Sequence, residues 1–126
     1  MSARVGINIR STKTARYALE IARGHKTLET RESDSLRCYV GRRVGLIETG
    51  RGKARLVGYA TIGAPIKLAY SDFKTREIDH LVKPGDLFYP KPGDFKYCYP
   101  MVNAAQCEHR EISTRGILAR SLRPNE

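Results

Sequence analysis

The sequence has no tryptophan, only three cysteines and no long hydrophobic run. Three irregularly spaced cysteines do not make a disulfide framework, which excludes a disulfide-stabilised secreted scaffold and indicates reduced thiols. Uninterrupted apolar stretches are a few residues long, whereas a membrane span needs about 20. The first residues, MSARV, lack the apolar segment of a secretory signal. We therefore expect a cytoplasmic protein with no membrane association.

Acidic residues are also scarce. The chain has 13 Asp and Glu against 23 Lys and Arg, a net charge of +10. So large a bias opposes compaction and indicates a polyanionic partner. Arginine outnumbers lysine, 15 to 8, which favours bidentate and stacking contacts with phosphates and bases over diffuse attraction to lipid headgroups. The partner we expect is RNA or another nucleic acid; the alternative is a protein that is merely basic.

The length of 126 residues fits a single domain, 1–126. Alternation of Val5, Ile7 and Ile9 with polar or small residues predicts a strand, and Ser11 and Thr12 can cap a helix that ends at Gly24. The remaining expected elements are an extended segment at 26–32, strands at 43–48 and 55–62, a helix from 71 to 82, and strands at 95–103 and within 112–122. This order predicts an α+β domain, a partly closed barrel with two flanking helices.

The most informative segment is Gly24-x-Lys26-x-x-Glu29-x-Arg31. Residues two apart on a strand share a face, so Glu29 and Arg31 can pair side by side. By the same alternation Lys26 starts on the opposite face, and we expect its long side chain to wrap around the end of the strand into a pocket shared with Glu29. The alternative is a salt bridge that only fixes the strand.

This segment, directly after an amphipathic first helix, resembles the GxKxxExR signature of the ASCH domain, a branch of the PUA-like superfamily. The order of the expected elements agrees along nearly the whole chain. The resemblance implies a PUA-like β-barrel, a cleft lined by the signature and RNA binding. Lys26, Glu29 and Arg31 are then the expected ligand-binding residues.

Some small members of this family hydrolyse the acyl group of N4-acetylcytidine with a Thr nucleophile three residues after the signature Lys. Lys26 matches that pattern, but Glu29 stands at the nucleophile position. The alternative function is therefore a hydrolase of the amidohydrolase or ribonuclease type. In that case the expected catalytic residues are Lys26, Glu29 and the neighbouring His25, which can transfer a proton.

Basic residues and tyrosines elsewhere in the chain suggest further contacts with nucleic acid. Tyr97 and Tyr99 share a strand face, where they either stack on bases or form the barrel wall. We expect the basic residues to form one continuous phosphate-binding patch. Its members are Arg42, Arg43, Arg51, Lys53, Arg55, Arg115 and Arg120.

No metal or cofactor is expected. Cys98, Cys107 and His109 lack the paired spacing of a zinc site, and Cys38 and Cys98 are expected to be small core residues. The sequence has no feature that defines an oligomeric state, a base preference, or RNA over DNA or a free nucleoside.

Overall fold

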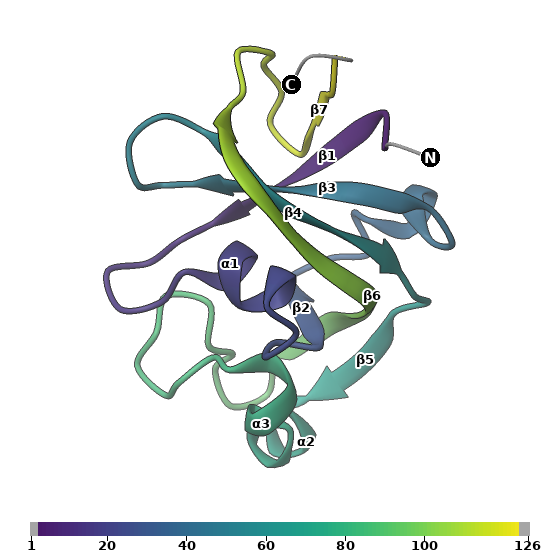
Figure 1. Ribbon diagram of the computed structural model, residues 1–126. Coiled ribbons are helices and arrows are strands. Elements are labelled where there is room, and N and C mark those ends of the chain that lie inside the picture. Colours follow the sequence, from purple (N-terminus) through teal and green to yellow (C-terminus); the bar gives the residue numbers. More distant parts are fainter. Residues whose placement is uncertain (1–2, 124–126) are drawn as a thin grey trace.

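The computed structural model describes residues 3–123 and contains a seven-stranded mixed sheet with short helices (Figure 1). The strands are β1 (Val5–Arg10), β2 (Leu28–Arg31), β3 (Arg43–Thr49), β4 (Arg55–Ile62), β5 (Ile66–Ala69), β6 (Phe95–Glu111) and β7 (Ala119–Ser121). The helices are α1 (Tyr17–Ala22), the 3-10 helix η1 (Arg37–Tyr39), α2 (Tyr70–Thr75) and α3 (Glu77–His80).

The strand order is β2-β6-β4-β3-β1-β7, and β5 pairs with β6 as a branch. β1 runs parallel to β3, and the other pairs are antiparallel. β6 spans the molecule: its first part pairs with β2 and β5, and its later part pairs with β4 (Figure 1). Register shifts along the β4–β6 pair mark bulges, which bend a sheet and increase its twist. The sheet therefore curls into a half-barrel.

The curl brings β1 close to β2, although the two strands do not pair. β7 pairs with Val5 to Ile7 of β1, and within residues 3–123 no strand pairs with the end of β1 on that side. Across this gap the Arg31 Nη2 of β2 donates to the carbonyl oxygen of Asn8 in β1 at 2.8 Å. A side chain, not a backbone ladder, closes the barrel at this seam.

Helix α1 covers the inner face of the sheet. Its residues Tyr17, Ala18, Leu19, Ile21 and Ala22 are buried. It packs on β4 at Gly58, where an added Cβ would lie 2.6 Å from the Ala22 Cβ and 2.4 Å from a backbone carbonyl oxygen. Only glycine allows so close an approach. Helices α2 and α3 lie beside β5 at the other end of the molecule (Figure 1).

The expected α+β class and partly closed barrel are confirmed, with three differences in detail. The helix expected at 71–82 divides into α2 and α3 at Arg76, where the Thr75 hydroxyl donates to the Asp72 carbonyl oxygen and competes with the helical pattern. Helix α1 begins at Tyr17 with no side-chain cap, and the Ser11 and Thr12 hydroxyls, expected to cap it, donate to Glu48 and Asp86.

The third difference is the length of β6. It continues to Glu111, although Asn103 has a positive φ of 52°. The strand was expected to end at Asn103, yet residues 104–111 continue it because β4 pairs with them.

Candidate functional site

A cavity of about 550 Å³ opens at the seam between β1 and β2. Its walls come from both strands, from α1 and from the loop that follows α3. We call it the seam cavity. Its lining residues are Asn8, Ile9, Arg10, Tyr17, Lys26, Glu29, Thr30, Arg31, Glu32, Thr49, Val82, Leu87, Phe88, Lys96 and Ile117.

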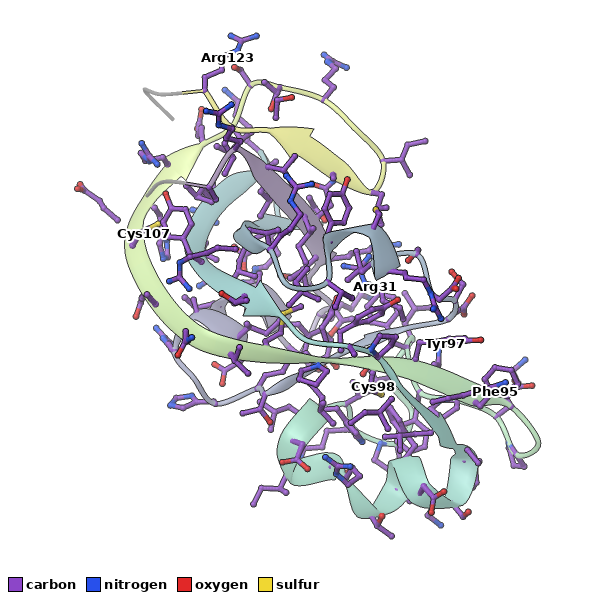
Figure 2. The ribbon with its side chains drawn as sticks, turned by 90° about the vertical axis from the view of Figure 1, so that its right-hand side faces the viewer. Arg31, Phe95, Tyr97, Cys98, Cys107 and Arg123 are labelled. Carbon is purple, nitrogen blue, oxygen red and sulfur yellow. The ribbon has the colours of Figure 1, made fainter. Side chains whose placement is uncertain are left out.

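Glu29 and Arg31 form an ion pair on one wall of the seam cavity. The Nε and Nη2 atoms of Arg31 lie 2.9 and 2.8 Å from Oε2 of Glu29. Arg31 is also opposite Tyr97 in the β2–β6 register, and Figure 2 shows Tyr97 and Cys98 on opposite sides of β6. Because Arg31 also reaches Asn8, this pair both closes the barrel and presents a carboxylate to the cavity.

Lys26 reaches the same wall from outside the strand. β2 begins at Leu28, so strand alternation does not apply to Lys26, and its side chain need not wrap around a strand end. The Lys26 side chain is 1% exposed. Its ammonium donates to the carbonyl oxygen of His80, lies 4.0 Å from Oε1 of Glu29 and sits 4.8 Å from the Tyr17 ring centroid. Burial lowers the pKa of Lys26 to about 8, against the opposing effect of Glu29.

His80, which the sequence analysis did not select, fixes the carbonyl that accepts from Lys26. Its buried ring stacks on Phe73 at a centroid distance of 3.7 Å. The ring Nε2 lies 2.7 Å from the Phe73 carbonyl oxygen, and the Val82 N–H donates to Nδ1 at 2.9 Å. These partners assign the proton to Nε2, and burial lowers the pKa of His80. No sequence motif marks this histidine.

Tyr17 and Asp86 form a second polar pair at the cavity. The Tyr17 hydroxyl donates to Oδ2 of Asp86 at 2.7 Å, and Thr12 donates to the same oxygen at 3.3 Å. The Phe88 N–H donates to Oδ1 at 2.9 Å. Burial and the Asp86 carboxylate raise the pKa of Tyr17. Asp86 ends the segment Lys83-Pro84-Gly85-Asp86, whose Pro-Gly pair is typical of a type II turn, but no local pattern indicates its contact with α1.

Lys96 and Thr30 also line the cavity and were missed. Lys96 is 5% exposed, and its ammonium lies 3.6 Å from the exposed carboxylate of Glu32. The Thr30 Oγ1 is buried and has no hydrogen-bonding partner of normal geometry among residues 3–123. The Cys98 thiol, a weak acceptor, interacts with it. Both residues were inconspicuous because a single Lys or Thr in a strand is common.

Three residues predicted from the sequence do not line the seam cavity. His25 is exposed and lies 3.0 Å from Glu20, because it follows the helix end on the solvent side; the proposed proton transfer from His25 is thus not supported by its position. Tyr99 is fully buried and its hydroxyl accepts from the Leu36 N–H, so it forms barrel wall and cannot stack on a base. Tyr97 is half-buried beside Phe95.

The seven basic residues predicted to form one patch lie at both ends of β3 and in or before β7. Arg42 and Arg43 precede or begin β3, whereas Arg51, Lys53 and Arg55 follow its other end, and seven extended residues span roughly 20 Å. Several are also engaged: Arg43 donates to Asn103, Lys53 pairs with Glu111, Arg55 with Glu48, and Arg120 donates to Asn8. Arg115 is exposed in the loop before β7.

Between residues 3 and 123, no group of three or more His, Cys, Asp or Glu side chains is placed to hold a metal ion. In that range, no helix has the length and apolar character needed to cross a bilayer. Cys98 is buried as expected, but Cys38 is exposed at η1 and is not a core residue.

The chain was compared with known proteins. No protein-family model and no curated protein matches the sequence. Solved structures do match: ASCH from Zymomonas mobilis superposes with a TM-score of 0.68 at 13% identity, covering 95% of this chain and 89% of that one. A Tyr-to-Phe mutant of that protein gives a TM-score of 0.71 at 14% identity, covering 94% and 91%. A Ser-to-Ala mutant gives 0.65 at 13%, covering 98% and 92%. The chain therefore has the fold of the ASCH proteins, as its GxKxxExR segment predicted.

Proposed function

We propose that this protein binds RNA and holds one base of the RNA in the seam cavity. The ASCH fold and the net charge of +10 both support a nucleic-acid partner. The observation that carries the proposal is the convergence of Lys26, Glu29 and Arg31 on one cavity of about 550 Å³. That volume lies within the range of small-molecule sites, about 300–1,000 Å³.

The chemistry of the walls suits a base. The Glu29 carboxylate accepts from the amino or imino N–H groups of a base edge, and the cations beside it donate to carbonyl oxygens and ring nitrogens. Tyr17 and Phe88 supply aromatic surface at the cavity, and single-stranded RNA is recognised by such stacking together with contacts to exposed base edges.

The charge of the walls suits an RNA chain. Four cations line the seam cavity, Arg10, Lys26, Arg31 and Lys96, against the two carboxylates of Glu29 and Glu32. A partly desolvated cavity of net positive charge concentrates anions at its mouth. This excess favours a ligand that carries phosphate.

The test is a fluorescence-anisotropy titration of labelled single-stranded RNA, with duplex RNA and single-stranded DNA of the same sequence in parallel. We expect Lys26→Met and Glu29→Gln to weaken binding of single-stranded RNA by about tenfold or more, because each removes a charge-assisted hydrogen bond. His25→Gln is the matched control, since His25 adjoins Lys26 in sequence but lies outside the cavity. Wild-type affinity in both cavity variants would contradict the proposal.

A second candidate function is hydrolysis, favoured by the lowered pKa of Lys26. With a pKa of about 8, roughly a tenth of the Lys26 side chains are neutral at pH 7, so this group can exchange a proton. Its protonated form can stabilise an oxyanion while Glu29 takes a proton from water. The reaction with N4-acetylcytidine would consume one water and release acetate and cytidine; with RNA the proton would come from a 2′-hydroxyl.

Hydrolysis is tested by incubating the purified protein with N4-acetylcytidine and, separately, with end-labelled RNA. Deacetylation or cleavage that is lost in both Lys26→Met and Glu29→Gln, and kept in His25→Gln, would support the enzyme. Binding without turnover in the wild type would exclude it.

A further inference from the structure

A second cavity, of about 720 Å³, adjoins the seam cavity and shares Arg10 and Leu87 with it. It lies between the loop after β1 and the hairpin that joins β3 to β4. We call it the loop groove. Its lining residues are Arg10, Ser11, Thr12, Lys13, Thr14, Gly50, Arg51, Gly85, Asp86 and Leu87.

The backbone holds the two loops of the groove together. The Ser11 N–H donates to the Thr49 carbonyl oxygen at 2.8 Å. Gly50 has a φ of 85°, and a Cβ there would lie 2.9 Å from the Ser11 carbonyl oxygen, so a side chain at this position would push the hairpin away. Arg51 follows Gly50 directly, and it lines the same groove as Arg10, at the end of β1, and Lys13, in the loop after β1.

These three cations are available to a ligand. Arg10, Lys13 and Arg51 are exposed, and within residues 3–123 none of them forms an ion pair or a side-chain hydrogen bond. The one carboxylate in the groove, Asp86, is already bound by Tyr17, Thr12 and Phe88. By contrast, Lys53 and Arg55 of the same hairpin pair with Glu111 and Glu48.

We propose that the loop groove binds the phosphate attached to the nucleotide whose base occupies the seam cavity. This inference rests on the proposed RNA binding and specifies its ligand: a nucleoside that carries phosphate, not a free nucleoside. Arg10 lies at the boundary of the two cavities, so a ligand can occupy both without leaving the surface. The exposed hydroxyl of Thr14 and the open backbone at Gly85 add small donors from which phosphate oxygens can accept.

The experiment compares the wild type with the triple variant Arg10→Gln, Lys13→Gln, Arg51→Gln. A control variant, Arg23→Gln, Lys74→Gln, Lys83→Gln, removes the same charge from exposed positions outside both cavities. Affinity is measured for three probes: the four ribonucleosides, the four ribonucleoside 5′-monophosphates, and a labelled random-sequence single-stranded RNA of ten nucleotides. The RNA is titrated at several salt concentrations.

We expect the groove variant to bind RNA about tenfold or more weakly, and its slope of log affinity against log salt to fall by about 0.7 for each phosphate that the protein no longer neutralises. Nucleoside affinity should not change.

Loss of 5′-monophosphate binding as well would place a terminal phosphate in the groove, and a loss confined to the RNA would place an internal one; both support the proposal. Equal RNA affinity and salt slope in the groove and control variants would overturn it while leaving RNA binding intact. Absence of all RNA and nucleotide binding by the wild type would instead contradict the proposed function.

Discussion

Glu29 of β2 and Glu48 of β3 are both buried carboxylates held by arginine, but the two sites differ in how fully their oxygens are bonded. Glu48 receives 2.8 Å hydrogen bonds from Arg16 on both oxygens, with Ser11 at 3.1 Å and Arg55 at 3.4 Å. The Arg16 hydrogen bonds lower the pKa of Glu48. Glu48 lines neither cavity.

Glu29 is bonded on one side only. The Arg31 Nε donates to Oε2 and its Nη2 lies 2.8 Å from the same oxygen, whereas the one cation within 4.0 Å of Oε1 among residues 3–123 is the Lys26 ammonium. This oxygen belongs to a residue that lines the seam cavity. A carboxylate whose oxygens are all bonded braces two elements, whereas one with unused acceptor capacity beside a cavity can bind a ligand. We therefore propose that Glu48 stabilises the fold and that Glu29 binds the ligand.

The largest expected effect is on stability, from Glu48→Gln. This change leaves Arg16 and Arg55 without a carboxylate, and we expect the free energy of unfolding to fall by about 3 kcal/mol, the low end for a broken buried pair because Arg16 is one-third exposed. The Glu29→Gln variant keeps an acceptor for Arg31 and should lose only about 1 kcal/mol. Urea unfolding measures both.

RNA titration of the same two variants distinguishes a carboxylate that stabilises the fold from one that binds the ligand. Glu48→Gln should bind RNA as the wild type does under conditions where it is folded, and Glu29→Gln should not. Equal losses of stability, or a loss of RNA affinity confined to Glu48→Gln, would reverse the assignment.

A second prediction concerns the pH dependence of stability and Lys26. The folded-state pKa of about 8 lies below the ordinary value of 10.5, so between these values the unfolded chain binds more protons at Lys26 than the folded chain. The contribution of Lys26 therefore becomes more favourable as pH rises from about 8 to 10.5, by up to about 3 kcal/mol, since one pKa unit corresponds to about 1.4 kcal/mol.

Lys26→Met removes this contribution, so the difference between wild type and variant isolates it. Comparing wild type with the variant is necessary because the Cys98 thiol changes stability with pH in the opposite direction. Burial raises the pKa of Cys98 from 9 to about 11, so the contribution of this thiol to stability falls as pH rises. Chemical unfolding of both proteins from pH 7 to 10.5 should show Lys26→Met more stable at pH 7 and the difference shrinking as pH rises. A difference in the free energy of unfolding that stays constant with pH would mean that burial does not lower the pKa of Lys26.

Much of the fold could be predicted because it depends on local patterns. The alternation of Val5, Ile7 and Ile9 gives β1, and Gly24, with a φ of 82°, ends α1 as glycine at that position does. The continuation of β6 could not be predicted, since its polar residues are held by pairing with β4 and not by their own propensity. The division at Arg76 depends on one Thr75 hydrogen bond.

The site was predictable only where spacing alone decides it. Glu29 and Arg31 are two apart on a strand, and they pair. The curl of the sheet and the loop after α3 bring Lys96, Asp86 and His80 to the cavity or next to its lining residues. No local sequence pattern indicates these contacts. The ion pairs of two predicted phosphate-binding residues could not be foreseen for the same reason. Charge counts along the chain do not reveal that Lys53 and Arg55 already have carboxylate partners.

The smallest expected effect concerns Thr30, and it tests whether this wall of the seam cavity binds a ligand or only stabilises the fold. Thr30 lines the seam cavity and carries a buried hydroxyl whose partner within residues 3–123 is the weakly accepting Cys98 thiol. Thr30→Val removes this hydroxyl at nearly constant shape, so the ligand-free protein should gain up to about 1 kcal/mol in the free energy of unfolding. If the ligand bonds the hydroxyl, RNA affinity should fall about three- to tenfold, the equivalent of one neutral hydrogen bond. The control is Thr27→Val, an exposed threonine on the same segment that does not line the cavity. A gain in stability with unchanged RNA affinity would show that Thr30 does not contact the bound RNA, and would leave Glu29 and its cations as the recognition groups at this wall.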